Sequence, residues 1–538
     1  MRRVVTTVGG RAVGFRTTGT GRPLVLLHRA PLSARSLEGL AGRLGAGRAV
    51  LAVDAPGYGD SDGLGLEAPT IADYARWLAP VLEATVDGRC ALYGSHFGAF
   101  LAIETAATRP DLVASVILDG FSVLDANERA RLVGTPFPDL APCRDGGHLA
   151  RAWSVRIDME RYTPWSDVSS AARRRADTAA PRATTAATVD MLSAGPRYAD
   201  AWNAAFAYEP LSALTRCAVP TTIVGRPSDV YVEHLRRLPA LGDRVRVVRP
   251  ADDAHAERII AAAAADAAVG TGRLRDAFAP APRCAAHRLT TTHGAVRVRQ
   301  SMPGSSAATV IVPAAASLPG PRAATAGDAF FETLGELDSV ILVDPSELEA
   351  GDDAASSGVA PHGRAVAEAI ERLGVEEVLF IGQYDGALVA LEAAATLGRG
   401  ACSLALDVPL VLTPDAPEAG CVVSLPDLEP RRDGSHLFAA WGAARDAGDF
   451  WPWCSTDVEH AVSLAPAPAG LHARTLAMLA APARAREYAM RVYAAAADLD
   501  PGTLRDARAL GAGDVPALDE HLRRVLAAPT KRPTFETT

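Results

Sequence analysis

The chain has 538 residues, of which 49% are apolar, and a formal net charge of −9, so it is long enough to form two sizeable cores. This acidic balance, with charges of both signs mixed along the chain, argues against nucleic acid as a partner, and the seven scattered cysteines disfavour a disulfide framework or a zinc site. The opening residues contain no apolar signal segment and no run of about 18 apolar residues follows, so we expect no membrane span and a cytoplasmic setting.

Short apolar segments alternate with helical patterns through the first half of the chain. Residues 4–17, centred on Gly9-Gly10, predict a β-hairpin. Helical spacing of apolar residues predicts helices at 70–86 and 99–108. The predicted strands of a parallel sheet are residues 23–28, 49–54, 90–93, 115–118, 221–224 and 244–248. This order predicts an α/β unit, a mainly parallel sheet flanked by helices, with a helical cap over about 121–212.

The chain repeats itself at an offset of 288 residues. The segment DGGHL at 145–149 recurs as DGSHL at 433–437. Further pairs at this offset are Gly94/Gly382, Gly98/Gly386, Asp119/Asp407, Trp153/Trp441, Asp158/Asp446 and Trp165/Trp453. Chance does not place so many matches in one register, so we predict a tandem duplication joined within 271–288. The predicted domains are 1–275 and 276–538, and the second cap falls at about 409–500.

Three segments of the first copy resemble the α/β-hydrolase superfamily: LLH at 26–28, DAPGYGDSD at 54–62 and YGSHFG at 93–98. The resemblance implies two tandem α/β-hydrolase-like units, but it says little about the reaction because this fold hosts many chemistries. Together with LLHRAPLS at 26–33 and the DGGHL segment of the cap, the first copy resembles a poorly characterised bacterial subgroup with G-x-H-x-G at the nucleophile turn.

In this fold the turn G-x-nucleophile-x-G exposes its central residue at the top of the sheet. The central residue is His96 in the first copy and Tyr384 in the second, so neither copy has the usual serine. Imidazole can act as a nucleophile, or as a general acid or base near neutral pH; the alternative is a relic side chain in an inactive turn. Ser95 and Phe97 flank the turn and are candidate substrate-binding residues, although Ser95 lies one position too early for a nucleophile.

The resemblance implies an acid and a base after the later strands. Asp229 is the candidate acid, although loops after strands often carry Asp for turn formation, and His255 before the final helix is the candidate base. Asp119 is either an alternative acid or substrate contact, or a structural turn residue, because it recurs as Asp407. His28 and Arg29 begin a loop that supplies an oxyanion-hole N–H in the resemblance, and we include both as candidate substrate contacts.

The cap motif allows two interpretations. His148 and Trp153 either reach into the pocket and bind substrate, or they pack the cap while Asp145 caps the helix. Their recurrence in both copies favours packing, because the second copy has lost most of the candidate site.

The second copy keeps the scaffold without the site. The segment aligned with His28 reads PAAA at 313–316, and residues from about 500 onward show no strand pattern and no counterpart of Asp229 or His255. We predict a degenerate domain that lacks its last strands and replaces one subunit of a homodimer, which leaves the chain a monomer. The alternative is that Tyr384 and Asp385 support separate chemistry.

The expected function is an enzyme that uses histidine-based acid/base chemistry on a small organic substrate, as a hydrolase, lyase, isomerase or cyclase. We expect no metal or cofactor, because the histidines lack ligand spacing and no nucleotide fingerprint is present. The alternatives are a non-catalytic protein that binds a ligand or a protein partner, and a serine esterase based on Ser95. Five side chains decide between an enzyme and a binding protein. If three or more of them converge within hydrogen-bond reach, an enzyme is favoured; if Phe97 and Trp153 fill the pocket, a binding protein is favoured. The five side chains are His28, His96, His148, His255 and Asp229.

Overall fold

The computed structural model describes residues 1–133, 135–174, 177–266, 272–275, 287–301, 304–315, 331, 339–344, 348, 359–398, 402–407, 426–450, 457–461 and 467–480. The chain divides into two compact units. The first consists of Met1–Ala281 and Pro430–Phe438, and the second of Pro282–Glu429 and Ala439–Thr538. No helix in the described ranges combines the length and apolar character needed to cross a membrane.

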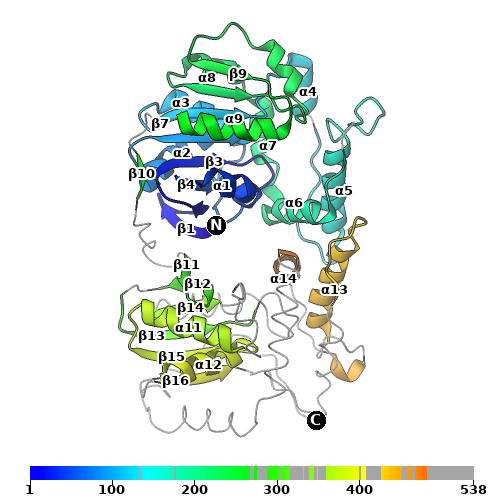
Figure 1. Ribbon diagram of the computed structural model, residues 1–538. Helices are drawn as coiled ribbons and strands as arrows, with labels where there is room; N and C mark the ends of the chain where they lie inside the picture. The colour runs from blue at the N-terminus through cyan, green and yellow to red at the C-terminus, as the bar shows by residue number, and fades with distance from the viewer. Residues whose placement is uncertain are drawn as a thin grey trace. The chain divides into compact units, whose positions relative to one another are not determined.

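The first unit is built on an eight-stranded sheet with the order β1-β2-β4-β3-β6-β7-β8-β9 (Figure 1). The strands are β1 (Arg2–Val8), β2 (Arg11–Thr18), β3 (Arg22–Leu27), β4 (Arg48–Val53), β6 (Cys90–Ser95), β7 (Val113–Asp119), β8 (Thr221–Val224) and β9 (Val245–Val248). The predicted hairpin is present as β1 and β2, β2 runs antiparallel to β4, and the remaining neighbours are parallel. The sheet is therefore mainly parallel, as the sequence predicts.

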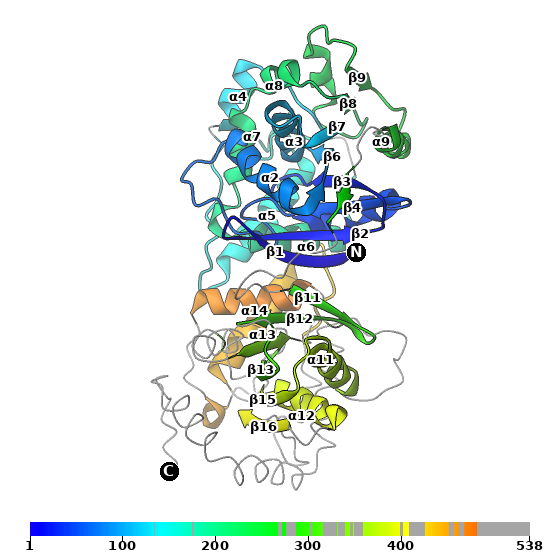
Figure 2. The same cartoon turned by 90° about the vertical axis from the view of Figure 1, so that its left-hand side faces the viewer.

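Helices cover both faces of this sheet. They are α2 (Ile71–Thr85) and α3 (Phe97–Thr108) on one face, and α1 (Glu38–Leu44) and α9 (Asp253–Asp266) on the other (Figure 2). In β3, Val25 and Leu27 join the core beneath α2 and α3, whereas Leu24 and Leu26 join the core beneath α1 and α9. Alternate strand residues point to opposite faces, so burial of both faces requires the continuous apolar runs from which these strands were predicted.

Five α-helices lie between β7 and β8 in the described residues, and the first four, in the segment predicted as the cap, are called the cap helices here. They are α4 (Ala126–Val133), α5 (Gly147–Arg161), α6 (Pro181–Ser193) and α7 (Asp200–Ala207). The following helix, α8 (Pro210–Arg216), packs beside α3 and returns the chain to the sheet. A small antiparallel pair, β5 (Val86–Asp87) with β10 (Arg273–Leu274), was not predicted.

The described part of the second unit contains a six-stranded sheet with the order β11-β12-β14-β13-β15-β16. Its strands are β11 (His287–Thr291), β12 (Gly294–Gln300), β13 (Ala307–Val312), β14 (Val340–Asp344), β15 (Glu377–Gln383) and β16 (Cys402–Asp407), and its helices are α11 (Ala360–Arg372), α12 (Gly386–Leu397) and α14 (Pro468–Ala480). A further helix, α13 (Ser435–Asp449), begins in the segment assigned to the first unit. The order of these six strands is the same as the order of the first six strands, β1-β2-β4-β3-β6-β7, in the sheet of the first unit. The predicted loss of the last strands, and most of the predicted joint and second cap, concern residues outside the described ranges.

Two local structures recur at the sequence offset of 288. His96 and Tyr384 both adopt a positive φ, 50° and 52°, in the turn after β6 and after β15. In α5 and α13, His148 and His436 each accept the backbone N–H of the residue five positions earlier through Nδ1, at 3.3 and 3.2 Å. The matched sequence segments therefore have matched backbone geometry.

Candidate active site

A cavity of about 390 Å³ is lined by the loops after β3, β6, β7 and β8 and by cap helices α4, α5 and α7. Its charged and polar lining residues are Arg29, His96, Ser122, Arg156, Glu160, Thr163, Arg174 and Asp177. Its aromatic lining residues are Phe97, Phe100, Tyr162, Trp165, Trp202, Phe206 and Tyr231. Ligands of open α/β sheets bind beyond the carboxyl ends of the strands, which is where these loops begin.

His96 stands at the turn between β6 and α3. Its φ of 50° and ψ of −110° form a conformation that residues other than glycine rarely adopt. Packing holds the turn in place: a Cβ at Gly94 would lie 2.0 Å from the carbonyl oxygen of Gly98, and a Cβ at Gly98 would lie 2.2 Å from that of Leu27. The backbone N–H of His96 donates to the carbonyl of Asp119 at 2.9 Å. The glycines of the motif thus allow the close approach that presents the imidazole to the cavity.

The imidazole of His96 pairs directly with a carboxylate. Its Nε2 lies 3.0 Å from Oδ2 of Asp229, whose side chain is only 8% exposed. The other carboxylate oxygen, Oδ1, accepts the backbone N–H of Tyr231 at 2.7 Å, which fixes its orientation. When the ring is neutral and its proton lies on Nε2, facing the carboxylate, Nδ1 carries the free lone pair.

The surroundings keep Asp229 ionised. Burial by itself would raise the pKa of this carboxyl group. The charge and hydrogen bond of His96, the N–H of Tyr231 and the charge of Arg29 outweigh burial, so the pKa lies below its usual value. An ionised carboxylate accepts a hydrogen bond from the ring and fixes its orientation.

Gly120 and Tyr231 enclose the pair. Gly120 has a φ of 67°, and a Cβ at this position would lie 2.7 Å from Nε2 of His96 and 2.9 Å from Oδ2 of Asp229. The ring of Tyr231 is edge-on to the imidazole, with 6.2 Å between ring centres. Burial, together with the charge of Asp229, raises the pKa of Tyr231 to about 12, so its hydroxyl is protonated at neutral pH.

The structure brings together four of the residues singled out from sequence. His96, Arg29 and Phe97 line the cavity, and Asp229, which is not itself a lining residue, pairs with the ring of His96, which is. Phe97 is the first residue of α3, a position whose backbone N–H has no acceptor within the helix. These four residues therefore combine a titratable ring, its acid partner, a cation and a backbone donor at one cavity.

His255, the expected base, is placed elsewhere. It lies in the first turn of α9 and is not among the residues that line the cavity. Its N–H donates to Oδ1 of Asp252 at 2.6 Å, and its Nδ1 accepts the N–H of Ala251 at 3.3 Å. The side chain closes the loop before the helix, and the predicted acid Asp229 pairs with His96 instead.

His28 is buried behind the loop that it was expected to open toward substrate. Its Nε2 accepts the N–H of Ala55 at 2.9 Å, and its Nδ1–H donates to the carbonyl of Arg29 at 3.1 Å. Burial lowers the pKa of His28 to about 4, so the ring is neutral at neutral pH. It ties the loop after β3 to the loop after β4 and does not reach the cavity.

Asp119 and Ser95 also lie outside the cavity lining. Asp119 forms a buried ion pair with Arg226, 2.7 Å from Nε to Oδ2, and accepts the hydroxyl of Tyr93 at 2.8 Å. These contacts engage its carboxylate beneath the turn, which matches the structural interpretation. Ser95 is the last residue of β6, so it is not at the apex of the turn.

His148 and Trp153 pack the cap and do not line the cavity. His148 is completely buried. Trp153 is edge-on to His436, a residue that clusters with the first unit, with 5.4 Å between ring centres. The N-cap of α5 is Gly146, without a side-chain cap hydrogen bond, so the expectation that Asp145 is the cap was wrong. The carboxylate of Asp145, one residue earlier, accepts the N–H of Gly147 at 2.9 Å. The positions of His148 and Trp153 match the packing interpretation.

Sequence reasoning missed the charged residues on the cavity side of α5. Arg156 and Glu160 are four residues apart and share a helix face. At the repeat offset their counterparts are Ala444 and Gly448, whereas the packing residue Trp153 is retained. A comparison of the two copies for positions that are charged in one and uncharged in the other would have found this pair. No comparable signal marks Tyr231 or Arg174.

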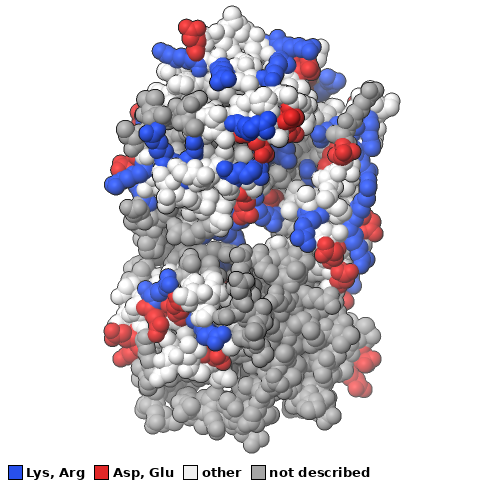
Figure 3. Space-filling model, in the orientation of Figure 1, with Lys and Arg blue, Asp and Glu red and all other residues white. Residues whose placement is uncertain are grey.

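Two further observations bear on what the site can hold. Within the described ranges, no three His, Cys, Asp or Glu side chains are grouped so that they could hold a metal ion. Figure 3 shows acidic and basic side chains interspersed over the visible face of the first unit. A cavity of this size, with aromatic walls, suits a small organic molecule.

Residues 22–141 match the family model of the α/β hydrolase fold, so this part of the chain has that fold. The chain is 36% identical over 110 residues to a protein of Mycobacterium phage D29 named "Putative non-heme haloperoxidase". It is 34% identical over 116 residues to the 2-hydroxy-6-oxononadienedioate/2-hydroxy-6-oxononatrienedioate hydrolase of Burkholderia vietnamiensis. Each match covers 20% of this chain and only 39% of the relative. A solved hydrolase from Pseudomonas aeruginosa is similar with a TM-score of 0.36 and 15% identity, over 49% of this chain and 97% of that one.

Proposed function

We propose that the first unit, with its α/β-hydrolase fold, is an enzyme that acts on a small organic substrate, with His96 as its general acid and base. The 3.0 Å contact between Nε2 of His96 and Oδ2 of Asp229 at the cavity wall carries this proposal. A carboxylate in this position orients the ring and stabilises the imidazolium that forms during proton transfer.

The pair condenses a three-residue arrangement into two residues. In a serine hydrolase the serine attacks, and a separate histidine, held by the acid, takes its proton. Here His96 occupies the serine position and contacts the acid itself. Its Nδ1 removes a proton from the substrate or from a water molecule, and later returns it. The N–H of Phe97 stabilises negative charge that develops on a substrate oxygen.

This arrangement supports proton-transfer chemistry, which includes hydrolysis by a directly activated water as well as lyase, isomerase and cyclase reactions. An acyl-serine route lacks support, because the turn residue has no hydroxyl and Ser95 does not line the cavity. One relative is named as a hydrolase of unsaturated dicarboxylates, which makes hydrolysis of a small organic acid the first reaction to test.

The second unit we propose as a duplicated copy that has lost its site. Tyr384, at the position of His96, is 3% exposed and belongs to the hydrophobic core of that unit. Asp385 is fully buried, and its carboxylate accepts the N–H of Ala315 at 3.1 Å. A fused copy that replaces a homodimer partner leaves the chain a monomer, which light scattering after size-exclusion chromatography measures. A symmetric dimer would contradict this assignment.

A non-catalytic binding protein is the second candidate, and one observation favours it. Of the five groups whose convergence indicates an enzyme, only His96 and Asp229 meet. On this view the cavity holds a ligand without converting it.

The test compares the full chain with its His96→Ala and Ser95→Ala variants on a library of small esters, lactones, amides and 2-oxo acids. We expect turnover by the wild-type chain and by Ser95→Ala, and loss to the background rate in His96→Ala. Unchanged turnover in His96→Ala would sink the proposal. Ligand binding without turnover by the wild-type chain would favour the binding alternative.

A further inference from the structure

The cap side of the cavity carries a buried arginine whose donors are poorly satisfied. Arg156, on α5, lines the cavity, and its side chain is only 15% exposed. Its Nε has no hydrogen-bond partner in the described part of the chain. Its Nη2 lies 3.5 Å from Oε1 of Glu160, the long limit of a hydrogen bond, and Nη1 donates to the sulfur of Met159 at 3.7 Å. A buried cation in this state costs free energy that a bound anion would offset.

Glu160 forms an ion pair with this guanidinium through one long contact of 3.5 Å, which leaves most of the N–H donors of Arg156 unsatisfied. Its Oε1 accepts the hydroxyl of Thr184 at 2.9 Å, and its Oε2 accepts the N–H of Ala179 at 3.2 Å. These bonds hold the carboxylate against the start of α6, and its contact with Arg156 is a single one, from Oε1. The protein fixes both groups and leaves N–H donors of Arg156 for a ligand.

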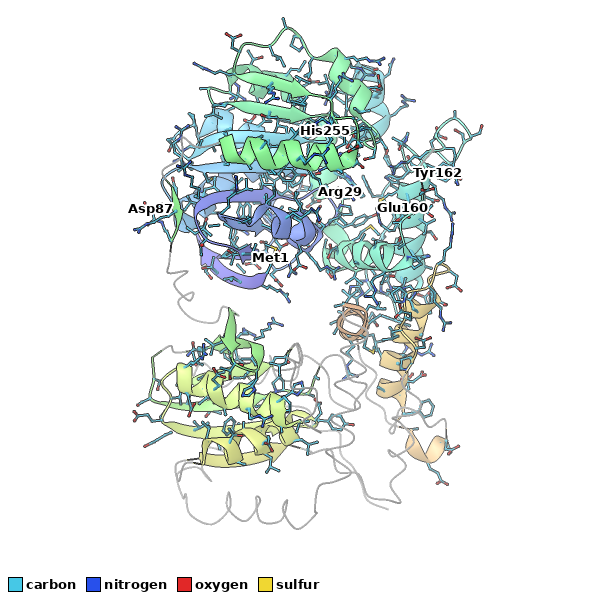
Figure 4. All side chains as sticks on the ribbon, viewed as in Figure 1. Met1, Arg29, Asp87, Glu160, Tyr162 and His255 are labelled. Atoms are coloured by element: carbon cyan, nitrogen blue, oxygen red, sulfur yellow. The ribbon has the colours of Figure 1, made fainter. Side chains whose placement is uncertain are left out.

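Two more arginines face the same space. Arg29, from the loop after β3, and Arg174 both line the cavity. Burial first, and then repulsion by Arg29 and Arg174, lower the pKa of Arg156 to about 10. In Figure 4, Arg29 lies on the side of the sheet that faces α5, the helix that carries Glu160. Glu160 and Asp177 also line the cavity, so the three arginines of the lining outnumber its carboxylates by one.

We propose that Arg156, together with Arg29 and Arg174, binds a carboxylate group of the substrate, so the substrate is a small organic acid. A guanidinium presents paired N–H donors that match the two oxygens of a carboxylate. The aromatic walls formed by Trp165 and Trp202 accommodate the apolar body of such an acid. This inference rests on the proposed function, because it takes the cavity to be the substrate site. It adds that the substrate carries a carboxylate and names the residues that bind it.

The experiment measures binding, so it does not depend on turnover. The full chain is titrated with phenylacetate, with neutral phenylacetamide and with phenyl phosphate, using calorimetry and the fluorescence of the cavity tryptophans. We expect phenylacetate to bind about 10- to 100-fold more tightly than phenylacetamide, because hydrogen bonds between a guanidinium and a carboxylate are stronger than those to a neutral amide. Arg156→Gln should abolish this preference, and Arg156→Lys should retain part of it because it keeps the charge without the fork.

Arg151→Gln is the matched control. Arg151 lies on the same helix but is exposed and bonds outward to the carbonyl of Asp139, so we expect wild-type binding. Equal binding of acid and amide, no acid binding up to roughly 10 mM, or a preference retained by a folded Arg156→Gln chain would each overturn the inference. Tighter binding of phenyl phosphate would also overturn it, by assigning the site to phosphate. The chain could bind the acid through Arg156 and yet show no turnover. That result would support this inference and contradict the proposed function.

Discussion

Nε2 of His96 and Oδ2 of Asp229 lie 3.0 Å apart, so the residue at the nucleophile turn holds the acid that a serine hydrolase assigns to a separate histidine. The contact depends on two features far apart in sequence. One is the strained turn after β6, and the other is the loop after β8. Neither the usual nucleophile nor the usual base takes part, since the turn residue is not serine and the ring of His255 accepts the N–H of Ala251 in the loop before α9.

Replacement of Asp229 by Asn tests the pair. The amide keeps the shape of the side chain but loses the charge that stabilises the imidazolium. We expect kcat to fall about 100-fold with little change in KM, because the charge acts mainly in the transition state. Steady-state kinetics on any substrate found in the screen measures both constants. Asp252→Asn, in an exposed residue that bonds to His255, is the control and should behave as wild type. A kcat for Asp229→Asn equal to that of the control would remove Asp229 from the mechanism.

Gly120→Ala tests how tightly the pair is enclosed. The new Cβ would approach Nε2 of His96 within 2.7 Å, and the φ of 67° is unfavourable for alanine. We expect a stability loss of about 1–2 kcal/mol from the backbone and a large loss of activity from displacement of the pair. Gly195→Ala shares a φ of 66° but has no atom within 4 Å, so it should lose similar stability and keep its activity. Urea unfolding and activity assays separate the two effects, and equal activity in both variants would contradict the prediction.

His96→Ser restores the sequence of a serine hydrolase turn, yet we expect no esterase activity from it. A serine needs a histidine within reach to accept its proton, and the remaining histidines of the described part of the chain are absent from the cavity lining. Hydrolysis of p-nitrophenyl acetate and labelling by a fluorophosphonate measure this directly. Rapid labelling of the introduced serine would mean that a base reaches the turn by a movement that this structure does not show.

The buried ring of His28 predicts a pH dependence of stability. Burial lowers its folded pKa to about 4, from about 6.5 in the unfolded chain. The unfolded state therefore binds more protons between these values, and this contribution is complete above pH 6.5 and is lost as the pH falls toward 4. The loss amounts to roughly 3 kcal/mol, on the order of 1.4 kcal/mol for each pKa unit.

Asp54 works in the opposite direction. Burial, and then the charge of Asp60, raise its folded pKa to about 6, so its contribution is present at low pH and is lost as the pH rises through 6. The two effects largely cancel in the wild-type chain between pH 4 and 6. In His28→Asn only the Asp54 effect remains, and stability should fall as the pH rises across this range. Proteolysis in urea, with peptides of the first unit followed by mass spectrometry, measures it; parallel profiles for both proteins would refute the assignment.

Much of the fold follows from local pattern. The hairpin around Gly9-Gly10 needs positive φ at both glycines, and both have it, at 58° and 79°. The predicted helix at 70–86 is present as α2, where Thr70 and Asp73 form the reciprocal hydrogen bonds of a capping box. Such features depend on neighbouring residues, so a linear sequence reveals them.

The sequence by itself determined that His96 occupies the nucleophile turn, because the spacing of Gly94 and Gly98 specifies that turn wherever it occurs. Only the tertiary structure decided which side chains meet the imidazole. The ring of His28 bonds to two backbone groups, the ring of His255 bonds to the loop before α9, and Asp229 after β8 meets His96 after β6. The direction of a side chain at a strand end or on a helix face is set by what packs against it, and those contacts join residues that the sequence leaves far apart.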